Sequence, residues 1–254
     1  MNDFSITLGK LPPSAFGLLE LPAPDTQLIE GLKALSDLTG LISDAMDLLG
    51  IEGVPEGGNL RPVLPGQRIV GPAITVKNVR RSDTVKEAVA DGRSRLADIE
   101  AHNLARPGDV LVVQGVSGIS SLGGISTAIA ARQQEAGIVV DGHVRDVEAI
   151  REHGLPVWSC GVTPATGKWR LETISVNAEV VIRGVTVLPG DIVAADETGV
   201  CFIPQALAAR VLAVAQTLEK DETMRLSHLS KGVPIRDLPK ANHTPNNEAS
   251  SRKG

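Results

Sequence analysis

The sequence lacks the features by which proteins commonly bind nucleic acid. Aromatic residues make up only 2% of its 254 residues, and no block of Lys and Arg and no alternation of basic with aromatic residues occurs. Thirty acidic against 25 basic residues give a net charge of -5. Because a phosphate backbone is bound mainly through clustered positive charge, we expect no nucleic-acid ligand.

Long apolar runs and targeting signals are also missing. No apolar stretch approaches the roughly 20 residues that span a bilayer, and the N-terminal sequence MNDFSITLGK lacks the basic flank and apolar segment of a secretory signal. The two cysteines, Cys160 and Cys201, lie far apart in apolar surroundings, which favours buried thiols over a disulfide or a metal pair. These absences predict a cytoplasmic protein without membrane association, and its 42% apolar content suffices for a packed core.

Three Pro-Gly pairs, which begin at Pro65, Pro107 and Pro189, each precede an apolar run. Pro followed by Gly suits the centre of a type II turn, so we expect a strand after each pair. Other Val- and Ile-rich segments predicted as strands are 137–141, 155–160, 179–184, 185–188 and 199–204. Helical patterns cover 27–38, 41–50, 84–91, 124–136, 146–153 and 205–229.

The order of these elements predicts one α/β domain with a mixed central sheet. Strands alternate with helices in the middle of the chain, as in parallel β-α-β units, whereas 179–204 has the pattern of antiparallel hairpins. We expect the domain to cover residues 26–230. Residues 1–25 are predicted as an extended N-terminal arm, and residues 231–254 as a polar, poorly ordered tail.

One β-α-β unit is predicted to form a binding site. Its strand Val110–Val113 leads through a Gly/Ser loop to a helix that begins near Gly124, and the strand Ile138–Asp141 follows. The right-handed crossover makes the two strands parallel, so the loops after them meet at one sheet edge, beside the positive end of the helix. The glycine spacing matches neither dinucleotide nor triphosphate motifs, which favours a small carboxylate as the ligand.

Arg145 and Asp146 follow the second of these strands directly. Arginine offers a planar pair of donors to a carboxylate, and the aspartate could hold a hard divalent cation through oxygen. Taken alone, these two residues favour a structural interpretation. Asp146 stands where it could cap the helix that follows, and Arg145 could be a surface charge.

Several longer motifs resemble the RraA-like family. They are GDVLVV (108–113), AGIVVDGHVRDVEAI (136–150), ISDAMD (42–47), GPAITVK (71–77) and PGDIVAADETGVCFIP (189–204). The family comprises metal-dependent 4-hydroxy-4-methyl-2-oxoglutarate and 4-carboxy-4-hydroxy-2-oxoadipate aldolases, oxaloacetate decarboxylases and the regulator of ribonuclease E. The resemblance extends from about residue 28 to 225, and it implies a swivelling β/β/α fold assembled into homotrimers or hexamers.

The resemblance also implies roles for individual residues. Arg145 corresponds to the arginine that binds the pyruvyl group and stabilises its enolate, and Asp146 corresponds to the aspartate that holds Mg²⁺ or Mn²⁺. The backbone N–H groups of Gly123, Gly124, Ile125 and Ser126 would receive the substrate carboxylate. The implied activity is that of a class II aldolase or decarboxylase, a lyase that cleaves a C–C bond of a 2-oxo acid through a pyruvate enolate.

The sequence departs from the family's aldolases in this loop. Gly124 stands where they commonly carry Asp or Glu, and Ser126 stands where they carry Leu. A neighbouring subunit could supply an acid from Glu219 or Glu222, and Lys168 could pair with a distal substrate carboxylate; a solvated role remains open for all three. The departure keeps two alternatives to the lyase open: a protein-binding module of the ribonuclease-regulator type and a non-catalytic binder of small carboxylates.

Overall fold

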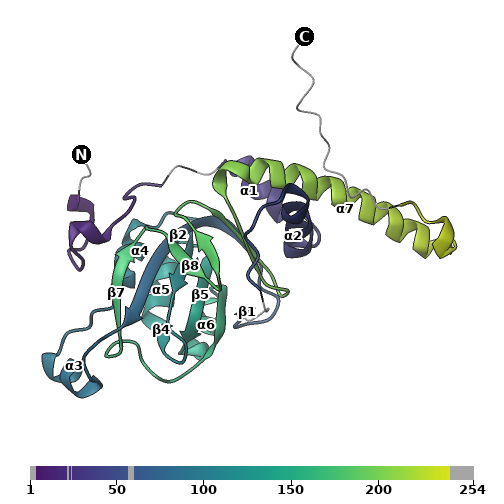
Figure 1. The fold of residues 1–254 in the computed structure, drawn as a ribbon. Helices are drawn as coiled ribbons and strands as arrows, with labels where there is room; N and C mark the ends of the chain where they lie inside the picture. Colours follow the sequence, from purple (N-terminus) through teal and green to yellow (C-terminus); the bar gives the residue numbers. More distant parts are fainter. Residues whose placement is uncertain (1–3, 22, 24, 57–59, 241–254) are drawn as a thin grey trace, which may run out of the picture.

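The computed structural model describes residues 4–21, 23, 25–56 and 60–240 (Figure 1). Its strands are β1 (Arg61–Pro62), β2 (Ile69–Arg80), β3 (Val110–Gln114), β4 (Ser120–Leu122), β5 (Gly137–Val144), β6 (Val157–Val162), β7 (Leu171–Val176), β8 (Val180–Ile182), β9 (Val185–Val187), β10 (Ile192–Ala195) and β11 (Val200–Ile203). In the described residues nine of them form one sheet in the order β1-β6-β5-β3-β2-β10-β11, with β4 beside β5 and β7 beside β2. The remaining two, β8 and β9, form a separate hairpin.

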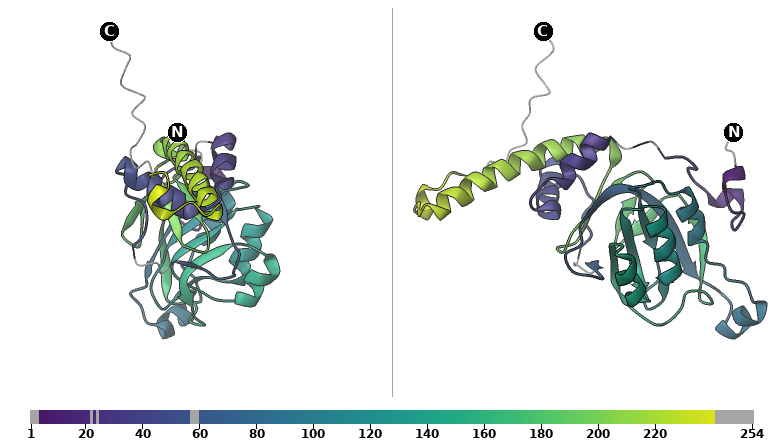
Figure 2. Two further views of the ribbon diagram at one scale, coloured as in Figure 1. Left: turned by 90° about the vertical axis from the view of Figure 1, so that its right-hand side faces the viewer. Right: turned by 180° about the vertical axis from the view of Figure 1, so that it is seen from behind.

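Six of the seven α-helices of the described residues pack against this sheet in two groups. They are α1 (Thr26–Lys33), α2 (Leu38–Leu49), α3 (Val85–Asp91), α4 (Asp98–Leu104), α5 (Gly124–Arg132), α6 (Val147–His153) and α7 (Ala208–Ser230), with short 3-10 turns η1 (Phe4–Ile6), η2 (Pro13–Ala15), η3 (Gln205–Leu207) and η4 (Ile235–Asp237). Helices α4, α5 and α6 cover one face of the parallel strands, as the right-hand view of Figure 2 shows. Helices α1, α2 and α7 pack against β10 and β11 in a separate apolar cluster.

Parallel strands form the centre of the sheet, because β2, β3, β5 and β6 all run in the same direction. Ile74 and Leu111 pack toward α4, α5 and α6, whereas their neighbours Ala73 and Val112 pack toward the β8–β9 hairpin and Trp158. Burial on both faces explains the nearly continuous apolar runs of these strands. The predicted α/β fold with a mixed sheet is confirmed, including the parallel pairing of β3 with β5 and the antiparallel hairpins near the C-terminal end.

The Pro-Gly turns begin strands as predicted. Gly66, Gly108 and Gly190 have φ angles of 73°, 90° and 91°, and β2, β3 and β10 follow within three residues of them. A positive φ at the third position is what defines a type II turn and what favours glycine there. These three turns therefore fix where the main strands of the sheet begin.

Some predicted helix bounds were wrong, and some elements were missed. The helix expected over 27–38 ends at Lys33, the helix expected from 41 already begins at Leu38, and the helix expected from 205 starts with a 3-10 turn before α7 begins at Ala208. The missed elements include α4, β4 and β7. In the described part of the chain, no helix combines the length and the apolar character needed to cross a membrane.

The N-terminal segment lies against the body of the protein. Phe16 bridges to Val176 of β7, and the buried carboxylate of Glu100 in α4 accepts hydrogen bonds from the backbone N–H groups of Leu8, at 2.8 Å, and Lys10, at 2.6 Å. At the other end, α7 runs along α1 and α2 and then extends away from the sheet (Figure 1). Most of the predicted tail, residues 241–254, lies outside the described residues.

Candidate functional site

A groove of about 690 Å³ lies beside the N-terminal end of α5. The residues predicted for the site all border it: Gly123, Gly124, Ile125, Ser126, Arg145 and Asp146. The strand pairing explains this arrangement. Because β3 and β5 are parallel, the loop that leads to α5 and the loop that leads to α6 emerge at the same edge of the sheet.

Asp146 connects the two loops. Its Oδ2 atom accepts a hydrogen bond of 2.9 Å from the backbone N–H of Gly124, the first residue of α5, and lies 3.5 Å from Nε of Arg145. Its backbone is left-handed, with φ 58° and ψ 49°. A left-handed non-glycine residue is uncommon and is tolerated best by Asn and Asp, so this turn aims the carboxylate back at α5.

Asp146 was expected to cap the helix that follows it, α6, and this prediction is wrong. Asp146 occupies the position before α6, but its side chain makes no capping hydrogen bond to that helix. It caps the neighbouring helix α5 instead, where a negative charge is favoured by the helix dipole. Arg145 is more than a lone surface charge, because it is half-buried and lies beside the carboxylate of Asp146.

Gly123 is required for the approach of Arg145 and Asp146. A Cβ atom at Gly123 would lie 2.4 Å from Oδ2 of Asp146, closer than real Cβ atoms approach, and 3.0 Å from Nε of Arg145. A Cβ atom at Gly124 would lie 3.0 Å from Cβ of Ala149. Gly123 therefore leaves room for the Arg-Asp pair against the start of α5, whereas the close neighbour of Gly124 is Ala149 of α6.

The start of α5 offers donors to an anion. The first N–H groups of a helix have no carbonyl partner within the helix, and here Asp146 takes the N–H of Gly124. The N–H of Thr127 already bonds to the carbonyl of Gly123. The N–H groups of Ile125 and Ser126 lie between them, so they are the donors by which the helix end could receive a carboxylate.

The donor set suits only certain cations. Among the described residues, no group of three or more His, Cys, Asp or Glu side chains could hold a metal ion. The hydrogen bond and the ion contact of Asp146 both use Oδ2, which leaves Oδ1 for a cation. One carboxylate fits Mg²⁺ or Mn²⁺, which keep water and substrate oxygens as ligands, and it does not fit Zn²⁺, which needs three or four protein ligands.

Two lysines of the described part of the chain border the groove. Lys168, which the sequence had suggested for a distal carboxylate, lies with its Nζ 4.7 Å from the ring centre of Trp169. Lys10 was missed, because it belongs to the N-terminal segment that was predicted as an arm. The hydrogen bonds from Leu8 and Lys10 to Glu100 hold that segment beside α4, and so they bring Lys10 to the groove.

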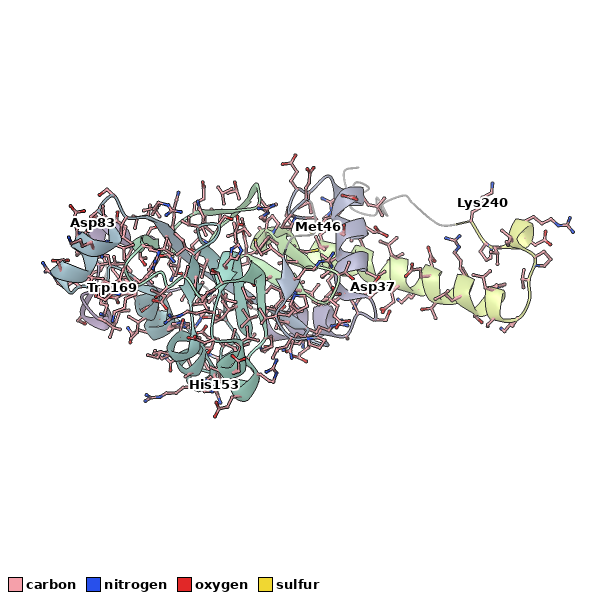
Figure 3. All side chains as sticks on the ribbon, turned by 90° about the horizontal axis from the view of Figure 1, so that it is seen from below. Asp37, Met46, Asp83, His153, Trp169 and Lys240 are labelled. Atoms are coloured by element: carbon pink, nitrogen blue, oxygen red, sulfur yellow. The ribbon has the colours of Figure 1, made fainter. Side chains whose placement is uncertain are left out.

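The two candidate acids of α7 do not reach the groove of their own chain. Glu219 accepts a hydrogen bond of 2.6 Å from the backbone N–H of Ser36, and hydrogen bonding to the side chain and the backbone of Ser36 lowers the pKa of the carboxyl. Glu222 is exposed. No residue of α7 borders the groove, and in Figure 3 Asp37, beside α7, lies well away from His153 at the end of α6. A contribution from a neighbouring subunit stays a prediction.

A buried group behind Ser126 was also missed. The Ser126 Oγ lies 2.7 Å from Nε2 of His102, and Nδ1 of His102 lies 2.6 Å from Oε1 of Glu135. The side chains of His102 and Glu135 are 0% exposed. Burial alone would lower the pKa of His102, but the hydrogen bond and charge of Glu135, with the charge of Asp98, raise it above its ordinary value.

The sequence and the fold are similar to those of known proteins. A family model described as RraA-like: Aldolase/RraA matches residues 39–202, more than half of the chain. The chain belongs to the RraA-like family. This match includes the whole β3-α5-β5 unit together with Arg145 and Asp146. It leaves out the N-terminal segment that carries Lys10 and all of α7.

Two relatives illustrate the range of the family. Over 215 residues the chain is 32% identical to Protein DlpA of Legionella pneumophila; the match covers 80% of this chain, which spans only 34% of the length of DlpA. Over 197 residues it is 31% identical to a protein of Halalkalibacterium halodurans named "Putative 4-hydroxy-4-methyl-2-oxoglutarate aldolase", covering 77% of this chain and 86% of that relative.

Solved structures confirm the RraA-like fold. An uncharacterized protein from Pseudomonas syringae pv. tomato matches with a TM-score of 0.71 and 26% identity, over 85% of this chain and 98% of that one. RraAS2 of Streptomyces coelicolor, described as an unusual member of the RNase ES inhibitor RraA protein family, matches with a TM-score of 0.66 and 29% identity, over 80% and 97%. The family therefore includes proteins named as aldolases and proteins named as inhibitors.

Proposed function

We propose that this RraA-like protein is a divalent-metal-dependent lyase that cleaves a C–C bond of a 2-oxo acid through a pyruvate enolate. The single observation that carries the proposal is the Arg145–Asp146 pair held against the start of α5 at the edge of the groove. This arrangement gathers a planar cation, a carboxylate and helix N–H donors around one small space. Relatives named as 4-hydroxy-4-methyl-2-oxoglutarate aldolases support the same reaction class.

Backbone N–H groups of α5 and the side chain of Arg145 would bind the substrate at two different points. The N–H groups of Ile125 and Ser126 receive the carboxylate of the substrate, and the guanidinium of Arg145 donates hydrogen bonds to the 2-oxo oxygen. As the C3–C4 bond breaks, its electron pair remains on the pyruvyl fragment and negative charge grows on that oxygen. The contact with Arg145 therefore strengthens along the reaction, which is how a fixed donor lowers a barrier.

Asp146 would hold Mg²⁺ or Mn²⁺ through Oδ1. When bound, such a cation withdraws electron density from the 2-oxo acid and so favours the enolate. Asp146 itself keeps Gly124 and Arg145 in place through Oδ2. Retro-aldol cleavage of a 4-hydroxy-2-oxo diacid and decarboxylation of oxaloacetate leave the same enolate, so one site can support both reactions.

A substrate with a second carboxylate fits the groove best. Lys10 and Lys168 border it in addition to Arg145. Among the described residues, Asp98 and Asp146 are the carboxylates that border it, and Asp146 accepts a hydrogen bond from Gly124. Three cationic side chains against two carboxylates give the border of the groove a net positive charge, which favours a dianionic 2-oxo acid over a monoanionic one.

A coupled pyruvate assay tests the proposal. We expect oxaloacetate and 4-hydroxy-2-oxo diacids to yield pyruvate in the presence of Mg²⁺ or Mn²⁺, and EDTA to stop the reaction. Pyruvate release that persists in EDTA would contradict the proposed metal dependence. No pyruvate release from any of these acids would contradict the proposed lyase activity.

A protein-binding role of the ribonuclease-regulator type is the alternative. It is favoured by the similarity to RraAS2 and by Gly124, which places no carboxylate at the start of α5. The alternative predicts that the protein slows a ribonuclease E-type enzyme by direct contact and that Asp146→Asn leaves this inhibition unchanged. Metal-dependent pyruvate release that Asp146→Asn abolishes would favour the lyase.

A further inference from the structure

Ser126, His102 and Glu135 form a continuous chain of hydrogen bonds that leads from the groove into the core. Ser126 borders the groove in the first turn of α5, His102 belongs to α4, and Glu135 lies in the turn between α5 and β5. The contacts of 2.7 Å and 2.6 Å place the imidazole directly between a hydroxyl and a carboxylate. In such an arrangement the carboxylate, here Glu135, orients the histidine, and the histidine can then exchange a proton with the hydroxyl of the serine.

Stability alone does not account for these residues. Taking two ionisable side chains fully out of water is costly, and apolar residues of similar volume often stabilise a protein as well or better. The Oε2 atom of Glu135 has no hydrogen-bond partner among the described residues, which adds to that cost. Buried ionisable groups that lead to a groove are candidates for function, because active sites commonly keep such groups although their burial lowers the stability of the fold.

The protonation of His102 is adjustable in this setting. Glu135 faces its Nδ1 atom, Asp98 adds negative charge from the first turn of the same helix, and the neutral hydroxyl of Ser126 faces Nε2. Neutral His102 accepts a proton from Ser126, whereas protonated His102 donates one to it. The same three side chains can therefore carry a proton in either direction.

We propose that Ser126 is the proton-transfer residue of this site, with His102 and Glu135 as the positioning residues that supply and remove its proton. The proposal rests on the lyase function proposed above. Asp146 is a poor candidate for this task, because its carboxylate is bonded to Gly124 and lies beside Arg145. Ser126 as a residue is only 6% exposed, which suits transfer of a proton along a hydrogen bond better than attack on a carbonyl carbon.

The proton balance closes within one retro-aldol cycle. Ser126 takes the proton of the C4 hydroxyl while it gives its own to neutral His102, and the C3–C4 bond breaks to leave a carbonyl product and the enolate. Ser126 then gives a proton to C3 of the enolate and recovers one from Nε2 of His102, which is neutral again. In decarboxylation CO₂ leaves instead, and the proton that C3 takes from the relay is replaced from solvent.

Exchange of the pyruvate methyl protons isolates this step. In D₂O with Mg²⁺ and pyruvate, the wild-type protein should replace the methyl protons of pyruvate by deuterium, and proton NMR measures this loss of signal. The exchange occurs because removal of a proton from C3 is the reverse of enolate protonation, the last step of the cycle. Ser126→Ala should slow the exchange by at least roughly 100-fold, the scale of a lost general acid-base. Glu135→Gln keeps the shape but removes the charge that raises the pKa of His102, so the pH profile of exchange should move to lower pH.

A matched control separates proton transfer from packing. Gln133 donates a hydrogen bond of 2.9 Å from Nε2 to the backbone carbonyl of His102, so it joins the same two helices without touching the imidazole. Gln133→Ala should leave the exchange rate and its pH profile close to those of the wild type. An equal loss in Gln133→Ala and Ser126→Ala would show a merely structural tie and overturn the proposal.

The remaining outcomes distinguish the relay from the lyase. Exchange and pyruvate release by the wild type, with Ser126→Ala equally fast, would overturn the relay and leave the lyase standing. Neither exchange nor pyruvate release by the wild type would overturn the lyase and the relay with it. A His102 ring that titrates at the same pH in the wild type and in Glu135→Gln, measured by NMR without metal, would also overturn the relay.

Discussion

Asp146 combines a strained backbone with a side chain that serves the neighbouring helix. Its φ of 58° lies in the left-handed region, which costs free energy for any residue with a Cβ atom. The conformation turns the carboxylate toward the N–H of Gly124 and away from α6. Asp and Asn are the non-glycine residues that tolerate this backbone best, so Asn is the substitution that tests the charge alone.

Asp146→Asn should abolish metal-dependent pyruvate release and leave the fold intact. The amide oxygen can still accept the hydrogen bond from Gly124, so we expect a loss of stability of less than about 1 kcal/mol, from the missing charge at the start of α5. Activity and thermal unfolding of the two proteins provide the measurement. Unchanged activity at unchanged stability would show that Asp146 only caps α5.

Arg145→Lys should lower kcat as well as kcat/KM. Lysine keeps the positive charge but loses the two parallel donors of the guanidinium, and a donor that acts on developing charge affects the chemical step. We expect a loss in kcat of at least roughly 100-fold, the effect of deleting one fixed donor to an oxyanion. Steady-state kinetics with oxaloacetate measure it.

Inhibitor binding provides a second measurement on Arg145. Oxalate mimics the pyruvate enolate, so Arg145→Lys should lower the affinity for oxalate more than it lowers the affinity for pyruvate. A change in KM alone, or an equal loss of affinity for both anions, would mean that Arg145 anchors the substrate without stabilising the enolate.

At the scale of elements, the β3-α5-β5 unit could be predicted and α4 could not. Apolar runs and the crossover rule sufficed to place Gly123, Gly124, Arg145 and Asp146 at one sheet edge, because those residues immediately follow the strands or begin the helix. Helix α4 instead buries Glu100 and a histidine among its seven residues. Buried charged residues break the apolar periodicity by which a helix is recognised.

The contacts of α4 explain why part of the site escaped prediction. Glu100 faces the N-terminal segment 90 and 92 positions away, and His102 faces Ser126 and Glu135, 24 and 33 positions away. No local pattern in the sequence encodes such pairs. Long-range hydrogen bonds between polar side chains become visible only when the packing of α4 against α5 is known.

The N-terminal segment is expected to select the substrate. Lys10 borders the groove because Glu100 holds the backbone of its segment. Lys10→Ala should therefore raise the KM for a 4-hydroxy-2-oxo diacid about 5-fold, the scale of one exposed charge pair, with oxalate inhibition unchanged. Lys86→Ala, at an exposed position of α3 outside the groove, is the control. Equal KM values for the wild type and Lys10→Ala would exclude the second-carboxylate role.

At the scale of the whole molecule, α7 is the feature that a single chain leaves unexplained. Its first half packs against α1 and α2, whereas its second half extends past the body (Figure 1). The second half carries Met224, Leu226 and Leu229 at 42%, 62% and 45% exposure. Ile125, in the first turn of α5 beside the groove, is 80% exposed. Apolar surface of this kind at two separate places favours contact with further copies of the chain.

We therefore expect a homotrimer or a hexamer built from trimers, as the resemblance to the RraA-like family implied. Light scattering at micromolar concentration should give three or six times the mass of 26.6 kDa. Replacing Leu226 and Leu229 by Glu should reduce that mass, because charge at a buried contact is costly, whereas Val89→Glu, at an exposed apolar position of α3, should not. If the groove is completed by a neighbouring subunit, pyruvate release should fall with the mass. A fully active wild-type monomer would contradict both expectations.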